Sequence, residues 1–170
     1  SSIVKALKSY SYLDQGPVQE VDLETGLDDT LLILKTKLSD IAVERQYASD
    51  LPRIQAYGGE LNQVWTNLLD NAADAIHESE HSDGVIVIRA FPQGELVVVE
   101  VEDNGPGIPP EALNRVFDSF FTTKPPGSGT GLGLNITYSI VVNKHRGEIT
   151  VESEPGRTVF RVELPRKVPD

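Results

Sequence analysis

Two asparagines lie one helical turn apart in a stretch with the pattern of an amphipathic helix. Residues 60–78 place apolar side chains at helical spacing, and Asn67 and Asn71 fall together on the polar side. Mg²⁺ usually keeps several waters and shares its other positions between a few protein oxygens and substrate phosphates. Because neutral amides add no negative charge beside phosphates, the pair suggests a magnesium–phosphate site. A solvated helix face is the alternative.

A carboxylate followed by a glycine-rich turn forms a second chemical pattern. Asp103 follows an apolar, β-rich run and precedes Asn-Gly-Pro-Gly, where Gly105 and Gly107 let the backbone turn sharply and approach a flat ligand. A carboxylate only accepts hydrogen bonds, so it suits an exocyclic amine such as N6 of adenine, whereas guanine has a carbonyl at that place. The same residues are common as an Asx turn that ends a strand, and both interpretations stay open.

Glycines occupy every second position from Gly127 to Gly133, directly before an apolar helical run. The bare N–H groups of such a loop and the positive end of a helix dipole predict an anion site. The spacing fits neither a P-loop nor a Rossmann fingerprint. We therefore expect a lid that closes over a phosphate chain, with Lys124 as a cation at its edge. A plain surface loop is the alternative.

Composition limits the classes of function. The 170 residues suit one compact domain, and a net charge of −11 argues against general binding of nucleic acid or anionic membrane. The absence of cysteine excludes disulfides, thiolate–metal sites and cysteine nucleophiles. No apolar run approaches the ~20 residues of a membrane span, and no signal peptide is visible. We expect a cytoplasmic domain, whether or not its parent protein is anchored in a membrane.

The elements that must position these residues follow from hydrophobic periodicity. Helical spacing is present at residues 1–13, 24–38, 60–78 and 132–144. Extended segments are expected at residues 21–23, 41–47, 54–57, 85–91, 95–102, 148–152 and 158–164, the last four as two antiparallel hairpins. Together they predict an α+β fold, a two-layer α/β sandwich whose helices pack on one face of a mixed, largely antiparallel sheet.

The order of the motifs resembles the catalytic domain of histidine kinases. Residues 67–72 are similar to its N box, residues 103–107 to its G1 box, residues 117–124 to its F box and residues 129–134 to its G2 box. The resemblance covers roughly residues 17–165. It implies the Bergerat-type ATP-binding fold, which this family shares with gyrase and the Hsp90-type chaperones.

The resemblance implies that ATP and Mg²⁺ are the cofactors and gives each matched residue a role. Asp103 would bind the adenine amine, with Thr158 assisting through water. Asn71 would ligate Mg²⁺. The catalytic residues would be Asn67, beside the phosphates and metal, and Lys124, reaching the γ-phosphate. The remaining nucleotide-binding residues would be Gly105, Gly107, Gly129, Thr130, Gly131, Leu132 and Gly133. Three aromatic residues would anchor the lid to the domain: Phe117, Phe120 and Phe121.

Two departures from related patterns bear on the chemistry. In the gyrase and chaperone branch, a glutamate one turn before the metal asparagine activates water. Here that position is Asn67, which cannot act as a base, so transfer to another acceptor is favoured over hydrolysis. Asp74 stands where many histidine kinases carry a basic residue, and the Asn-Ala-Ala-Asp-Ala form is closer to the chaperone branch.

A histidine kinase also needs a phosphoacceptor histidine followed by an acidic residue on a dimerisation helix. His77, His81 and His145 lack that context. We expect residues 1–15 to be the tail of the dimerisation helix, residues 16–170 to be the ATP-binding domain, and the acceptor to precede this chain.

The resemblance also implies partners. They are ATP, the protein's own dimerisation domain and a response-regulator receiver domain, with no nucleic acid and a homodimeric full-length protein. An anti-sigma-factor-type serine kinase and a non-catalytic nucleotide-sensing module are the alternatives.

Overall fold

The computed structural model of the chain describes residues 2–6, 17–79, 83–119, 121 and 133–169. A five-stranded sheet in the order β2-β4-β5-β7-β6 forms its centre. The strands are β2 (Ala42–Tyr47), β4 (Val85–Gln93), β5 (Leu96–Asp103), β6 (Glu148–Glu154) and β7 (Arg157–Pro165). Strand β2 pairs in parallel with β4, and the other neighbours pair antiparallel. The predicted mixed, largely antiparallel sheet is confirmed.

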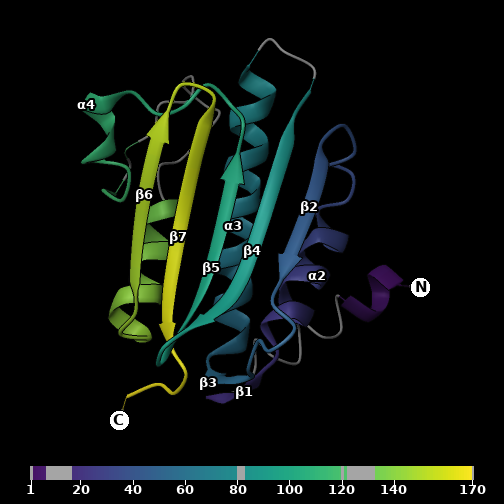
Figure 1. The fold of residues 1–170 in the computed structure, drawn as a ribbon, viewed down its shortest axis with the longest axis vertical. Coiled ribbons are helices and arrows are strands. Elements are labelled where there is room, and N and C mark those ends of the chain that lie inside the picture. Colours follow the sequence, from purple (N-terminus) through teal and green to yellow (C-terminus); the bar gives the residue numbers. More distant parts are fainter. Residues whose placement is uncertain (1, 7–16, 80–82, 120, 122–132, 170) are drawn as a thin grey trace.

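Helices cover one face of this sheet, so the fold has two layers as predicted (Figure 1). They are α2 (Leu23–Ile33), α3 (Gly58–Glu78), α5 (Gly133–Tyr138) and the π-helix η1 (Ser139–Lys144). The short α4 (Pro110–Leu113), which periodicity did not predict, lies beyond the β6 edge (Figure 1). A separate antiparallel pair joins β1 (Gln19–Val21) to β3 (Ile54–Ala56). No helix among the described residues is long and apolar enough to cross a bilayer.

Strand β5 is the central strand of the sheet, and its run of valines is buried on both faces. Val97, Val98 and Val99 are all fully buried, as expected for a run of valines in the middle of a sheet. Farther along the strand the pattern alternates, because successive side chains point to opposite faces. Asp103, the last residue of β5, therefore lies on the face covered by helices, whereas Glu102 lies on the other face. The strand end thus carries one acidic side chain on each face of the sheet.

Helix α3 packs a stripe of apolar side chains against the sheet, at the helical spacing that the sequence predicted. Its buried members include Leu61, Val64, Leu68, Ala72 and Ile76. The helix begins at Gly58, two residues before the predicted start. The N–H groups of a first helical turn have no partner within the helix, so glycines are tolerated there more readily than in the interior.

Helix α2 is shorter than predicted. Asp22 caps its start, because Asp22 Oδ1 accepts hydrogen bonds from the N–H groups of Glu24 (3.1 Å) and Thr25 (3.4 Å). The helix ends at Ile33, and residues 34–40 continue as a series of turns alongside α3. The sequence has helical spacing to residue 38, but this segment forms turns, and its side chains Lys37 and Asp40 bind α3.

The predicted helix at 132–144 divides into α5 and the π-helix η1. His145 closes the π-helix, since its backbone N–H donates to the Ile140 carbonyl at 3.1 Å and its Nδ1 lies 2.8 Å from the same oxygen. Its Nε2 accepts the N–H of Tyr57 at 3.1 Å, just before α3 begins. Burial lowers the pKa of His145, so the neutral ring that can make both bonds is favoured. His145 therefore joins the end of η1 to the start of α3.

The N-terminal helical prediction is confirmed only for residues 2–6. Within that piece Ala6 is buried, whereas Ile3 and Val4 are exposed. The predicted division between residues 15 and 16 falls in the stretch 7–16, outside the described residues.

Candidate functional site

Asp103 is a buried carboxyl group at the end of β5. It is 2% exposed, and its Oδ1 accepts the N–H of Gly105 at 2.9 Å. This is the Asx-turn geometry, so that interpretation of the sequence is correct for the local backbone. Burial raises the pKa of Asp103 to about 6, the hydrogen bond from Gly105 opposes the rise, and the charge of Glu102 adds to it. Among the described residues, the second oxygen of Asp103 has no hydrogen-bond partner, and none of the ion pairs involves Asp103.

The two glycines of this turn are required by the protein's own packing. A Cβ atom on Gly105 would lie 2.9 Å from Asp103 Oδ1 and 3.1 Å from the Cβ of Ala75 on α3. Gly107 has φ +90°, and a Cβ there would lie 2.5 Å from the carbonyl oxygen of Glu154. The turn is therefore held tightly between α3 and the end of β6, which fixes the orientation of Asp103.

Asn104, which the sequence analysis did not single out, anchors the same turn to β4. Its Oδ1 accepts the N–H of Val85 at 2.8 Å, and its Nδ2 donates to the carbonyl of Asp83 at 2.7 Å. An asparagine beside a strand end is the available signal in the sequence, because its side chain can replace backbone partners. Its long-range partners are not encoded in the local pattern.

Thr158 lies opposite Asp103 in the β5–β7 register, so both side chains are on the inner face. Thr158 is also buried, and its Oγ1 lies 2.7 Å from Ser153 Oγ. The same Ser153 oxygen accepts the N–H of Ile108 at 2.7 Å. The hydroxyl pair thus connects the turn after Asp103 to the β6–β7 hairpin. Ser153 was not predicted as a site residue.

The polar face of α3 lies beside the start of α5. Asn67 Nδ2 donates to the Gly133 carbonyl at 3.1 Å and to Thr137 Oγ1 at 3.3 Å. Asn71, one turn farther along α3, is half-buried and has no hydrogen bond within the described residues. The two predicted amides therefore differ in their contacts with the described residues: Asn67 bonds to α5, and Asn71 bonds to none of them.

Two aspartates flank Asn71 on α3, and both bind one lysine. Lys37, from the turns after α2, pairs with Asp70 and, at 2.7 Å, with Asp74. Burial acts to lower the pKa of Lys37, but its hydrogen bonds with Asp70 and Asp74 outweigh burial and raise it. Among the described residues, no group of three histidine, aspartate or glutamate side chains could hold a metal ion.

Most of the predicted lid residues lie outside the part of the chain that the structure describes. Lys124, Gly129, Thr130, Gly131 and Leu132 lie outside the described residues, as does Phe120. Gly133 is the first residue of α5.

The predicted aromatic anchor at Phe117 does contact the body of the domain. Its ring lies 6.2 Å from that of Phe160 and 5.6 Å from that of Tyr138, measured between centroids. Asn135 Nδ2 donates to the Phe117 carbonyl at 3.0 Å, a further contact that the sequence did not reveal. Phe121 lies under the guanidinium group of Arg115, 4.8 Å from its ring centroid.

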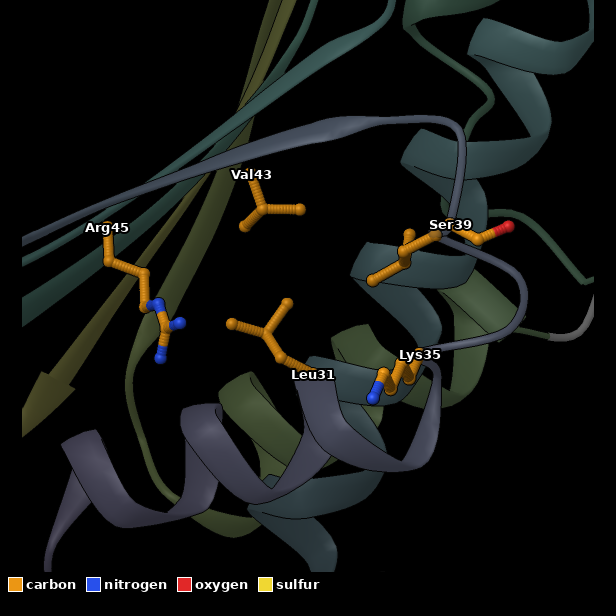
Figure 2. A pocket seen from close by; sticks show the side chains of 6 residues that line it. Leu31, Lys35, Ser39, Val43 and Arg45 are labelled. Atoms are coloured by element: carbon orange, nitrogen blue, oxygen red, sulfur yellow. The ribbon is translucent and has the colours of Figure 1, made fainter.

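A pocket of about 230 Å³ lies elsewhere, between α2 and β2 (Figure 2). Leu31 and Val43 face each other across it, while Lys35 and Arg45 lie at its borders (Figure 2). It contains neither the carboxylate nor the amides predicted for the nucleotide. We therefore assign the candidate site to the Asp103 turn and the polar face of α3, and not to this pocket.

Three comparisons with known proteins identify the family of the chain. The model of the family described as histidine kinase-, DNA gyrase B-, and HSP90-like ATPase matches residues 58–168. Sensor kinase CckA of Brucella abortus is 35% identical over 99% of this chain and 19% of its own length. The chain thus spans less than half the length of the curated relatives it matches.

Solved histidine kinases have the same fold. The nucleotide-free catalytic domain of histidine kinase ThkA matches with a TM-score of 0.78 and 30% identity, over 89% of this chain and 97% of that domain. ThkA in complex with the response regulator TrrA matches at 0.75 and 28%, over 97% of this chain and 46% of that one. Full-length ShkA with AMPPNP matches at 0.76 and 27%, over 99% of this chain and 36% of that one. The chain therefore belongs to the histidine kinase-, DNA gyrase B- and HSP90-like ATPase family, as an ATPase domain of the sensor histidine kinase type.

Proposed function

We propose that this domain binds Mg·ATP and transfers the γ-phosphoryl group to a histidine on a dimerisation domain of the same protein. The observation that carries the proposal is Asp103, a buried carboxyl group with one oxygen held by Gly105 and no partner for the other among the described residues. A perturbed carboxyl group in such a position is a candidate for function. The histidine kinase relatives and the AMPPNP complex of ShkA support the same nucleotide class.

Asp103 would select adenine through its free oxygen. With a pKa of about 6, the group is mostly ionised at neutral pH and so acts as a hydrogen-bond acceptor. The amine of adenine can donate to it, whereas the carbonyl of guanine would be repelled. Thr158, opposite Asp103 in the register, would assist through water.

Asn71 fits the requirements of Mg²⁺ shared with phosphates. Its amide oxygen is a hard, neutral ligand, and Mg²⁺ usually takes its other ligands from water and substrate phosphates. When bound, Mg²⁺ would neutralise part of the triphosphate charge. Asn67 has no group that can remove a proton from water, and its contact with Gly133 would position the start of α5.

The lid would complete the site. Gly129, Thr130, Gly131, Leu132 and Gly133 would wrap the phosphates with backbone N–H groups, and Lys124 would reach the γ-phosphate. The transition state spreads negative charge over the transferred group, so the cation and N–H donors would act by electrostatic stabilisation.

The phosphoacceptor is proposed to lie on a dimerisation domain, with residues 1–15 as its last part. His145 is a poor acceptor because it is 2% exposed and both ring nitrogens have protein partners. His77 pairs with Asp40, and His81 lies outside the described residues. We further propose a homodimeric parent acting in the cytoplasm, where ATP is available, on a receiver domain, as the ThkA–TrrA complex suggests by analogy.

Calorimetry tests nucleotide binding, with ATP and GTP each titrated with and without Mg²⁺. We expect Mg·ATP to bind, GTP to bind more weakly, and chelation of Mg²⁺ to weaken ATP binding. Equal affinities for ATP and GTP would remove Asp103 from base selection.

Incubation with γ-labelled ATP tests phosphoryl transfer. We expect the full-length parent to form an acid-labile phosphohistidine and this chain alone to remain unlabelled. Acid-stable phosphate would instead indicate a serine kinase. Tight ATP binding by a parent that never becomes labelled would indicate a nucleotide-sensing module.

A further inference from the structure

Lys37 reaches α3 from a segment that the sequence assigned to another helix. Residues 34–40 run alongside α3 as turns, and two of their side chains bind it. Lys37 pairs with Asp70 and Asp74, and Asp40 pairs with His77 at 3.0 Å. The contacts follow α3 in order, so this segment is aligned with the helix over about two turns.

The two aspartates bound by Lys37 flank Asn71. Asp70 directly precedes Asn71, and Asp74 follows it by three residues, which places Asp74 on the neighbouring surface of the helix. Lys37 Nζ lies within ion-pair distance of both carboxylates. The two aspartates alone would carry a charge of −2, and the ammonium group of Lys37 reduces the net charge of the cluster to −1.

We infer that Lys37 is a positioning residue for Mg·ATP, because it holds Asp70 and Asp74 in fixed orientations and offsets their charge beside Asn71. The inference rests on the proposed function, in which Asn71 is the magnesium ligand. Without the charge of Lys37, the two carboxylates would repel the triphosphate more strongly and would compete for the divalent cation. Lys37 therefore acts through the aspartates and needs no contact with the nucleotide.

This inference gives a physical role to Asp74. The resemblance to histidine kinases marks position 74 as one where a basic residue is common, and this sequence has an acid there. Through its contact with Lys37, Asp74 brings an ammonium group to the same part of α3. The cation comes from a different segment of the chain, which is why the sequence did not reveal it.

Lys37→Met is the direct test, and Lys35→Met is its matched control. Both variants remove one positive charge from the same turn segment, but Lys35 borders the pocket between α2 and β2 and is not paired with α3 (Figure 2). In calorimetry we expect Lys37→Met to bind Mg·ATP roughly tenfold more weakly, and Lys35→Met to stay within about twofold of the native chain. Equal effects of the two variants would show a general loss of charge and would overturn the inference.

A second measurement separates charge compensation from a structural ion pair. Mn²⁺ is titrated without nucleotide and followed by its paramagnetic effect on the amide signals of α3. We expect Lys37→Met to gain Mn²⁺ binding near Asp70 and Asp74, and the native chain to show none there. A Lys37→Met chain that loses stability in urea but gains no Mn²⁺ binding would overturn the inference.

Rescue variants complete the design. Lys37→Arg keeps the charge, and the triple variant Lys37→Met/Asp70→Asn/Asp74→Asn removes the need for it, so both should restore Mg·ATP affinity to within about threefold. Failure of both rescues would overturn the inference. If the native chain binds no Mg·ATP, the proposed function fails as well, whereas normal native binding with an unaffected Lys37→Met variant rejects only the role of Lys37.

Discussion

Glu102 and Asp103 are consecutive acids in β5 whose side chains lie on opposite faces of the sheet. On the outer face, Glu102 Oε1 accepts from Arg89 at 2.9 Å and pairs with Arg157 at 3.2 Å. On the inner face, Asp103 has no cation among the described residues and is held by the N–H of Gly105. One carboxylate is neutralised at the surface, and the other is buried with its charge uncompensated.

This difference separates a carboxylate that is paired with arginines from the carboxylate that we propose to bind the nucleotide. The outer face continues as an ion-pair network in which Glu100 contacts Arg89 and Arg161, and Arg161 also contacts Glu163. Such pairs satisfy each other and offer little to a ligand. A buried carboxylate without a cation costs stability, and such a group in a rigid turn is a candidate for ligand binding.

Gly107→Ala should have the largest effect on stability. Gly107 lies in the turn that follows Asp103, and this turn has no room for a side chain. The new Cβ would combine a positive φ with a 2.5 Å approach to the Glu154 carbonyl. We expect the free energy of unfolding to fall by roughly 3–4 kcal/mol, measured by urea titration.

Gly156→Ala is the matched control for this change. Gly156 has a similar φ of +85° but no atom within 4 Å of a built Cβ. Only the backbone strain remains, so the loss should be about 1 kcal/mol. Equal losses at the two positions would show that contact with Glu154 does not hold the turn.

Asp103→Asn should stabilise the free domain while weakening ATP binding. The amide oxygen can still accept from Gly105, but the buried charge is gone. The native pKa lies about two units above the ordinary value of 3.8, and each unit corresponds to about 1.4 kcal/mol, so the gain at pH 7 should approach 3 kcal/mol. The lost hydrogen bond to a charged acceptor should weaken ATP binding by about 1.5–3 kcal/mol in calorimetry.

The stability difference between the native domain and Asp103→Asn should depend on pH, and the direction of that dependence tests the buried charge. Below pH 3.8 the carboxyl group is protonated in both folded and unfolded chains, so native and variant domains should have similar stability. As the pH rises toward 6, the unfolded chain releases this proton more readily than the folded chain, and the native domain loses stability relative to Asp103→Asn. Above about pH 6 the difference should be constant. A variant less stable than the native domain at pH 7 would contradict the buried-charge interpretation.

The sequence predicted the helices and strands whose signal lies within a short stretch of neighbouring residues. The spacing of apolar residues predicts α3 and the strands of the two hairpins. The run of valines in β5 indicated a buried strand at the centre of the sheet. The motif order was sufficient to indicate the family. Asp103 was predicted at a strand end for the same reason, because the residues that indicate the strand and those that indicate the turn are adjacent in the sequence.

Features that depend on distant contacts were not predicted. After α2 ends at Ile33, Lys37 pairs with two carboxylates on α3 that are 33 and 37 positions away in the chain. At the end of the π-helix, His145 contacts both the Ile140 carbonyl and the distant Tyr57 N–H. Asn104 satisfies the start of a strand that lies 19 residues earlier. Each case needs the three-dimensional neighbour before the role of the residue can be stated.

Asn71→Ala should affect binding and leave the fold intact, in contrast to the change at Gly107. Asn71 is half-buried and bonds to none of the described residues, so the free energy of unfolding should change by about 0.5 kcal/mol or less. Affinity for ATP should fall at least tenfold in Mg²⁺ and remain nearly unchanged in EDTA. Gln63→Ala, an exposed amide on the same helix, is the control and should bind normally. An equal loss in EDTA would place Asn71 against the nucleotide itself, without a metal role.

Glu102→Gln should have the smallest effect, because the outer carboxylate is one member of a part-exposed network. Removing its charge weakens pairs with Arg89 and Arg157, and we expect about 1 kcal/mol or less, decreasing with added salt. The like charge beside Asp103 is also removed, so the pKa of Asp103 should move down, as measured by carbon-detected NMR titration of its carboxyl group. Mg·ATP affinity at pH 7 should be unchanged, because Asp103 is already mostly ionised there. A loss of affinity as large as that of Asp103→Asn would mean that the two faces of β5 are not functionally distinct.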